Sequence, residues 1–150
     1  MKVMGLDFGS RTCGVSISDA LLLTAQPVEI IRRERESALR KTLARIEELA
    51  SENDVRLIVL GLPLNMDTTS GARVTATREF GEKVARRTGL PVVYSDERLT
   101  TVEAIEMMDQ MEIAPADRER YVDMIASNII LQEYLENHRE ELQASAAEAE

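Results

Sequence analysis

Residues 2–19 read KVMGLDFGSRTCGVSISD, and this stretch decides how the fold begins. Residues 2–7 and 13–19 are two strand-like runs, and the turn formers GSRT lie between them, which predicts a β-hairpin. Residues 3–6 of the first run are apolar and Asp7 closes them, so a carboxylate is expected at the end of a buried strand. A carboxylate that loses its water must be protonated, paired or metal-bound. Asp7 is therefore the first candidate for a functional residue.

The rest of the chain alternates helices and strands. Apolar residues such as Leu39, Leu43 and Ile46 recur at three- and four-residue spacing, which indicates amphipathic helices. The run 55–60 is apolar except for Arg56, which is typical of a strand covered by helices on both faces. The further elements expected are a strand at 24–31, a helix at 36–51, a strand at 55–60, a loop at 65–71, a helix at 72–88, a strand at 91–95 and helices near 101–110 and 116–137. This order predicts an α/β domain with a mixed five-stranded sheet, its first three strands antiparallel, flanked by helices.

Length and composition bound the class of protein. A chain of 150 residues with 44% hydrophobic content can bury a core and is expected to form one domain over residues 1–137. From His138 the composition turns to Glu, Ala and Gln, so residues 138–150 are expected to be an acidic, disordered tail. No apolar run approaches the ~20 residues that span a bilayer, and the N-terminus lacks a signal-peptide pattern. A cytoplasmic protein without membrane contact is expected.

The net charge of −9 disfavours broad binding to nucleic acids. The charge is unevenly spread, however, and a cationic cluster comprises Arg32, Arg33, Arg35, Arg40, Lys41 and Arg45. The favoured interpretation of this cluster is a solvated helix face with Glu partners at helical spacing. Local basic surface remains open as the alternative.

The metal chemistry open to the chain is restricted to oxygen ligands. Cys13 and His138 are the only residues of their types, which rules out an intrachain disulfide and a Cys/His zinc site. Oxygen ligands select Mg²⁺ or Mn²⁺.

Two further acids occur in settings that resemble that of Asp7. Glu97 follows the expected fifth strand, and ligands in open sheets gather where strand ends face a crevice. Asp123 lies on the margin of the apolar stripe of the last long helix, one turn before Ser127. Three converging carboxylates could bind divalent cations that hydrolyse a phosphodiester in line. For any one acid alone, a cap, a turn residue or a surface residue is the favoured interpretation.

Four segments together resemble a known family in order and spacing, and they are GLDFGSRTCGVSISD (5–19), GLPLNMDTTSG (61–71), YSDERLTTVEA (94–104) and VDMIASNIILQEYL (122–135). The chain resembles the YqgF/RuvX family of RNase H-like nucleases over nearly its whole length. The resemblance implies an RNase H-like fold and a hydrolase that matures the 5′ end of pre-16S rRNA, or alternatively a Holliday junction resolvase. It also implies that Asp7, Glu97 and Asp123 form an acidic triad that is both catalytic and metal-binding.

Several residues near these motifs are candidates for substrate binding. They are Arg11, Asn65, Arg73, Arg98 and Thr100. Three of them have a structural alternative: Thr100 could cap a helix, Asn65 could hold a polar turn, and Arg73 could be an exposed helix charge. Arg98 is favoured as a site residue because it is next to Glu97. Aromatic residues are scarce, so recognition is expected to use phosphates and backbone shape rather than base stacking.

The expected partner is nucleic acid, either pre-16S rRNA or a pre-ribosomal particle, with branched DNA as the alternative. The protein could act as a monomer or as a homodimer, because symmetric junction cutting favours a two-fold dimer and end trimming does not need one. Two rival classes remain. An actin-like phosphotransferase needs a second lobe that 150 residues cannot supply, whereas a non-catalytic ribosome-assembly or transcription adaptor could use the same fold.

Overall fold

The computed structural model describes residues 1–63, 70–96 and 101–149, except for the side chains of 70, 101–105, 118–120, 123 and 149. The expectations for Asn65, Glu97, Arg98 and Thr100 therefore lie outside the described residues. So does the side chain of Asp123, although its backbone is described within a helix.

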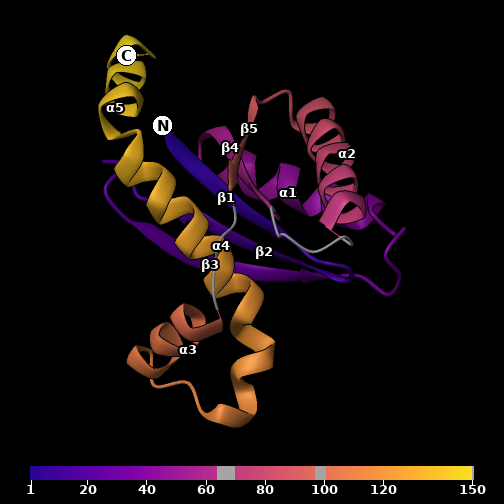
Figure 1. Ribbon diagram of the computed structural model, residues 1–150. Helices are drawn as coiled ribbons and strands as arrows, with labels where there is room; N and C mark the ends of the chain where they lie inside the picture. The colour runs from indigo at the N-terminus through magenta and orange to yellow at the C-terminus, as the bar shows by residue number, and fades with distance from the viewer. Residues whose placement is uncertain (64–69, 97–100, 150) are drawn as a thin grey trace.

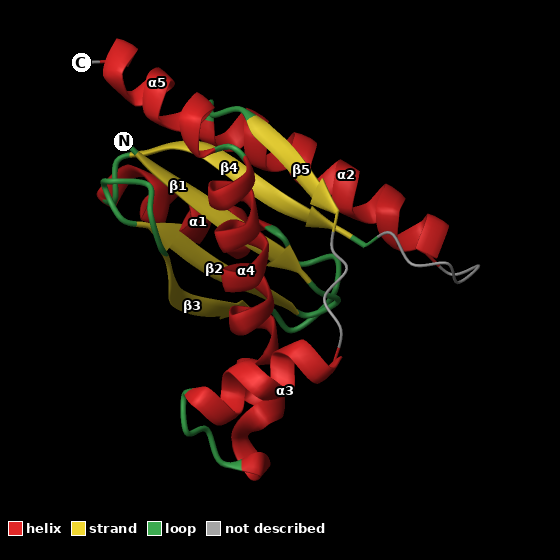
Figure 2. Ribbon diagram, turned by 60° about the vertical axis from the view of Figure 1, so that its left-hand side comes forward, coloured by secondary structure: helices red, strands yellow, loops and turns green. Residues whose placement is uncertain are grey.

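The sheet has five strands in the order β3-β2-β1-β4-β5 (Figure 2). The strands are β1 (Lys2–Phe8), β2 (Thr12–Ser18), β3 (Ala25–Arg32), β4 (Val55–Leu62) and β5 (Val92–Asp96). β1 pairs antiparallel with β2, and β2 antiparallel with β3, whereas β4 is parallel to both β1 and β5. The predicted hairpin and the mixed sheet with three antiparallel strands are confirmed.

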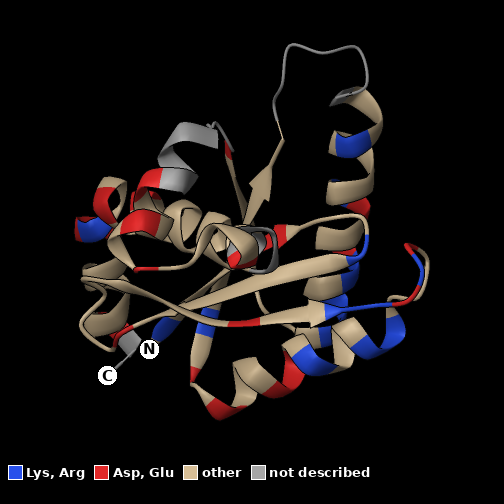
Figure 3. Ribbon diagram, turned by 90° about the horizontal axis from the view of Figure 1, so that it is seen from below, with Lys and Arg blue, Asp and Glu red and all other residues tan. Residues whose placement is uncertain are grey.

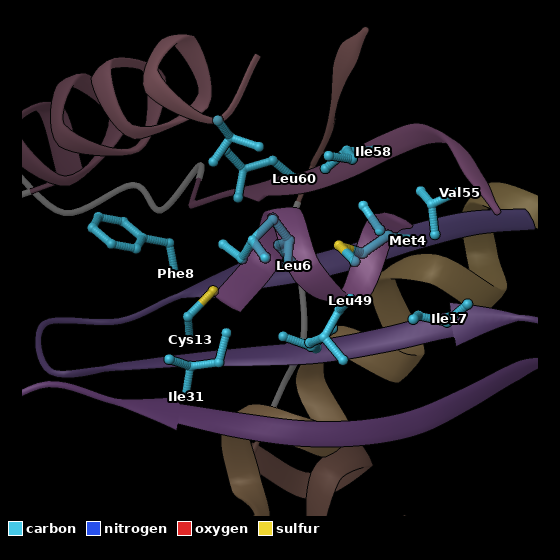
Figure 4. Close-up of a cluster of buried hydrophobic side chains, with 14 of the residues drawn as sticks. Met4, Leu6, Phe8, Cys13, Ile17, Ile31, Leu49, Val55, Ile58 and Leu60 are labelled. Atoms are coloured by element: carbon cyan, nitrogen blue, oxygen red, sulfur yellow. The ribbon is translucent and has the colours of Figure 1, made fainter. Parts of the chain in front are cut away.

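Helices cover both faces of this sheet (Figures 1 and 2). α1 (Arg40–Glu52) and α2 (Ser70–Thr88) lie on one face, and α4 (Arg118–Asn137) crosses the other. The period-two alternation of β1 divides its side chains between the two layers. Met4, Leu6 and Phe8 pack in the core under α1 and α2, as Figure 4 shows for this part of the sheet. Val3 packs in the second core, under α4.

The N-terminal half of α4 extends beyond the sheet, where α3 (Thr101–Gln110) packs against it (Figure 1). Met108 and Ile125 are the buried residues of this contact, and Met107 packs at its margin. These methionines pack the helices together, as flexible apolar side chains commonly do.

α4 approaches the sheet closely because small residues line the contact. A Cβ on Gly5 would lie 2.7 Å from the Cβ of Leu131 and 3.1 Å from the carbonyl oxygen of Ser127. The hydroxyl groups of Ser16, on β2, and Ser127 are buried and hydrogen-bonded at 2.7 Å. Only a glycine at position 5 leaves room for the α4 backbone at this distance from β1.

The C-terminal segment differs from its expected disorder, since residues Arg139–Ala149 form helix α5. Leu142 is 5% exposed and packs, with Ala146 at its side, against the core under α4. The four-residue spacing of these two residues supplies an apolar face, and Glu and Ala are strong helix formers. In the described part of the chain, no helix combines the length and the apolar character that crossing a bilayer requires.

Candidate functional site

Asp7 lies in the penultimate position of β1, and its side chain is 9% exposed. Its neighbours Leu6 and Phe8 point into the core under α1 and α2. Because side chains alternate along a strand, Asp7 lies on the α4 side of the sheet, like Val3 and Gly5. The structure thus holds a nearly buried carboxylate at the strand end, as the sequence predicts.

The carboxyl ends of β1, β4 and β5 meet at one edge of the sheet because the three strands run parallel. Leu6 is paired with Leu60, and Leu60 with Tyr94, so the ends of β1 and β5 flank the end of β4. β5 ends at Asp96, and Glu97 is the next residue in the chain. The segment that carries Glu97 therefore starts from the edge at which Asp7 lies.

α4 approaches the same region from the other layer. The carbonyl of Ser127 faces Gly5, two residues before Asp7, and Asp123 precedes Ser127 by one helical turn. Leu131 also faces Gly5, which sets α4 and β1 side by side over this stretch. Among the described side chains, no group of three or more His, Cys, Asp or Glu residues could hold a metal ion, and those of Glu97 and Asp123 are not among them.

Arg33 is a residue of the site that the sequence analysis missed, because it assigned this side chain to a solvated cluster. Arg33 is only 7% exposed. Its guanidinium donates hydrogen bonds to the carbonyl oxygens of Gly9, Ser10 (2.8 Å) and Thr12 (3.4 Å) in the hairpin turn. Burial lowers the pKa of Arg33, but a guanidinium stays charged in proteins. Arg33 therefore fixes the turn that directly follows the strand of Asp7.

Phe8, the residue after Asp7 in the chain, contacts Phe80, Arg33 and Arg73. Its ring stacks on that of Phe80, with centroids 4.0 Å apart, and the guanidinium of Arg33 lies 4.7 Å from the ring centroid. Arg73 donates a 2.9 Å hydrogen bond to the carbonyl of Phe8 and forms a 3.3 Å ion pair with Glu36. Of the candidate phosphate ligands, Arg73 is thus tied to the end of β1, while Arg11 is exposed in the hairpin turn.

Arg33 also explains why α1 starts later than the expected residue 36. Its Nε donates a 3.2 Å hydrogen bond to the carbonyl of Glu36, which keeps this residue in the loop before Arg40, where α1 begins. No feature of the sequence separates Arg33 from its neighbours Arg32 and Arg35. Its role depends on the pairing of β3 with β2, which brings the end of β3 beside the hairpin turn.

Asp19 illustrates the structural alternative for an acid at a strand end. Its Oδ1 accepts hydrogen bonds from the backbone N–H groups of Leu23 (2.8 Å) and Thr24 (3.0 Å). Partial burial raises the pKa of Asp19, but these backbone hydrogen bonds outweigh it and hold the pKa below its usual value. Asp19 therefore closes the β2–β3 turn.

Removal of the Arg33 guanidinium should weaken both the fold and the site. In Arg33→Met, the carbonyl groups of the hairpin turn lose a shared buried donor, so the free energy of unfolding should fall by about 1–3 kcal/mol. If Arg33 positions Asp7, the kcat of the nuclease activity that the family resemblance implies should fall, while its KM should stay unchanged. Urea unfolding and steady-state kinetics measure the two effects, with the exposed Arg86→Met as a control that should alter neither. A stability loss with unchanged kcat would reduce Arg33 to a purely structural residue.

Comparison with solved structures shows that the fold is RNase H-like. The structure "T. thermophilus RuvC in complex with Holliday junction substrate" has a TM-score of 0.59 at 16% sequence identity, and the match covers 93% of this chain and 96% of that one. A second RuvC structure from Thermus thermophilus has a TM-score of 0.57 at 14% identity, with the same coverage. At these identities the likeness shows the fold alone.

Sequence comparison gives the family. Residues 1–137 match the family described as "RuvX: Holliday junction resolvase", and the chain belongs to this family. A protein of Agathobacter rectalis is 56% identical over 136 residues, which are 91% of this chain and 95% of that protein. A protein of Lachnospira eligens is 48% identical, over 91% of this chain and 98% of its own length. Both relatives bear the name "Putative pre-16S rRNA nuclease".

Proposed function

We propose that this RuvX-family protein is a divalent-metal-dependent nuclease that hydrolyses phosphodiester bonds in the 5′-end maturation of pre-16S rRNA. The observation that carries the proposal is the nearly buried carboxylate of Asp7, at the sheet edge where β4 and β5 also end. The names of the two bacterial relatives support RNA as the substrate. The family description favours one alternative, Holliday junction resolution on branched DNA.

The donor set of the site fits a hard divalent cation. Cys13 is buried in the core under α1 and α2, on the other face of the sheet from Asp7. His138 stacks on Tyr134 at the junction of α4 and α5. Neither nitrogen nor sulfur ligands of these types are therefore available near Asp7, which leaves the oxygen ligands that Mg²⁺ and Mn²⁺ prefer.

Asp7, Glu97 and Asp123 would hold the metal in this proposal. The bound metal would supply a nucleophilic water at neutral pH and stabilise negative charge on the leaving oxygen. The approach of α4 to Gly5 and the chain order Asp96–Glu97 support the convergence of the three acids. Three carboxylates that converge in this way would repel one another, so the site would disfavour the metal-free state and favour a cation.

The chain's own cations would bind and orient the substrate. Arg11, exposed in the hairpin turn, is the described residue best suited to contact a phosphate, and Asn65, Arg98 and Thr100 are assigned the same task from the family motifs. Arg73 would position the end of β1 through its hydrogen bond to the Phe8 carbonyl. With a net charge of −9, specificity must come from a structured RNA or a pre-ribosomal particle rather than from general attraction.

The metal dependence is tested on free precursor 16S rRNA with purified protein in Mg²⁺, in Mn²⁺ and in excess EDTA. Cleavage is expected with either metal, and none is expected in EDTA. Addition of Mg²⁺ should also raise the melting temperature of the protein by mass action. Full activity in EDTA would contradict the proposal, and tight metal binding without turnover on any nucleic acid would favour the non-catalytic adaptor.

A further inference from the structure

A basic hollow of about 380 Å³ lies between the end of β3 and the start of α1. We call it the basic hollow, and its lining comprises Arg32, Arg33, Glu34, Arg35, Ala38, Arg40 and Lys41. In Figure 3 the blue of Lys and Arg follows the end of the strand into the loop and into the first turn of α1. A protein with a net charge of −9 thus concentrates five cationic side chains and one carboxylate at this place.

These cations differ from Arg45, which belongs to the same cluster in the sequence. Arg45 forms two hydrogen bonds with the carboxylate of Glu29, at 2.8 and 2.9 Å, and one with Glu48 at 2.6 Å. The predicted Glu partner at helical spacing is therefore confirmed for Arg45 by Glu48, whereas its other partner, Glu29, lies on β3 and was not predicted. Arg32, Arg35, Arg40 and Lys41 are exposed, and within the described part of the chain none of them forms an ion pair.

The hollow adjoins the edge of the sheet where Asp7 lies. β3 runs in the same direction as β1, so both strands end at this edge, and the register aligns Phe8, Cys13 and Ile31 across the three antiparallel strands. Arg33 belongs to the hollow and also holds the hairpin turn that follows Asp7. The hollow opens on the α1 side of the sheet and Asp7 lies on the α4 side, so a bound strand would pass over the edge between them.

We propose that the basic hollow binds the phosphate backbone of the RNA substrate at nucleotides beyond the cleaved bond. This inference rests on the proposed function, which supplies RNA as the substrate. Four of the five cations are exposed, and three of these four are arginines, whose planar forks bind phosphate oxygens through two hydrogen bonds. The lining contains no aromatic side chain, so the hollow binds backbone without reading bases.

The test compares Arg40→Gln/Lys41→Gln with the matched control Lys83→Gln/Arg86→Gln. Both pairs are exposed on helices, and both double variants remove two positive charges. The control pair lies in the second half of α2, which leads away from this edge towards the start of β5. The measurement is the Kd for a short fluorescent single-stranded RNA in EDTA, over a series of KCl concentrations.

In Arg40→Gln/Lys41→Gln, the slope of log Kd against log [KCl] should be lower than in the wild type by about 1.4. Two phosphate contacts are lost, and each contact with a single strand contributes about 0.7 to the slope. The Kd of this variant at physiological salt should rise on the order of 10-fold, whereas the control should behave as the wild type. Equal slopes for both double variants would overturn the inference. The inference would also be overturned if Arg40→Gln/Lys41→Gln kept its affinity for RNA and lost only binding to poly-L-glutamate. That result would identify the hollow as a site for acidic protein.

Cleavage of precursor rRNA by the same proteins in Mg²⁺ separates this inference from the proposed function. An active nuclease whose RNA binding does not depend on the hollow would overturn the inference alone. A wild-type protein that binds RNA through the hollow but does not cleave it would overturn the proposed function alone.

Discussion

The Asp7→Asn protein should fold as the wild type does and lose cleavage activity by roughly 10³-fold. Asparagine keeps the shape of the side chain, which is 9% exposed, but replaces the carboxylate by a neutral amide that binds divalent cations poorly. A catalytic metal stabilises transition-state charge by several kcal/mol, and each 1.36 kcal/mol corresponds to a factor of ten in rate. The measurement is the rate of RNA cleavage in Mg²⁺ by protein whose folding has been checked by thermal melting.

The matched control for this change is Asp54→Asn. Asp54 pairs with Arg56 at 3.0 Å and precedes β4 at the opposite edge of the sheet, so its neutralisation should leave the cleavage rate unchanged. Glu97→Gln should likewise gain less thermal stability from Mg²⁺ than the wild type, because it removes a ligand of the same metal. Normal turnover by a folded Asp7→Asn protein would show that Asp7 is not a metal ligand. If Mg²⁺ raised the melting temperature of Glu97→Gln as much as that of the wild type, Glu97 would not be a ligand either.

Gly5→Ala should destabilise the protein by about 1–3 kcal/mol or more, as over-packing of a dense contact does. The added Cβ would lie 2.7 Å from the Cβ of Leu131, an atom fixed to the α4 backbone, so relief requires α4 to move away from β1. That movement would also shift position 123 relative to Asp7, and cleavage should fall with stability. Urea unfolding and the cleavage rate of the fraction that is folded measure the two effects.

Gly71→Ala provides the control for the stability measurement. A Cβ at Gly71 meets nothing within 4 Å, and alanine is the better helix former in the first turn of α2. Its unfolding free energy should equal or exceed that of the wild type. A Gly5→Ala protein as stable as Gly71→Ala would show that α4 does not depend on the small residue for its position.

Local pattern was sufficient to predict the sheet. The turn formers at 9–12 predict the hairpin, and the run at 55–60, apolar except for Arg56, predicts a strand with both faces covered, which β4 is. The same reasoning identified Asp7 as a carboxylate at a buried strand end. These inferences succeed because each depends on residues that are neighbours in the sequence.

Contacts between distant parts of the chain could not be predicted in this way. The sequence does not distinguish Arg33 from Arg32 and Arg35. Only the pairing of β3 with β2 brings Arg33 to the carbonyls of the hairpin turn. Composition predicted disorder after His138, but Leu142 reaches the core under α4 and α5 forms. Arg45 likewise differs from Arg32, Arg35, Arg40 and Lys41, which form no ion pair with any described residue, because β3 places Glu29 beside Arg45. The assignments of Glu97 and Asp123 remain predictions from the sequence and the family.

Incubation of the protein with immature small ribosomal subunits, followed by mapping of the 5′ end of their 16S rRNA, tests the proposed function most directly. A four-way DNA junction serves as the parallel substrate at the same physiological salt concentration, and both reactions are run with Mg²⁺ and with EDTA. We predict Mg²⁺-dependent conversion of the precursor to the mature 5′ end, with little cutting of the junction. Efficient, symmetric cutting of the junction without any processing of the rRNA would contradict the proposal and identify the protein as a resolvase.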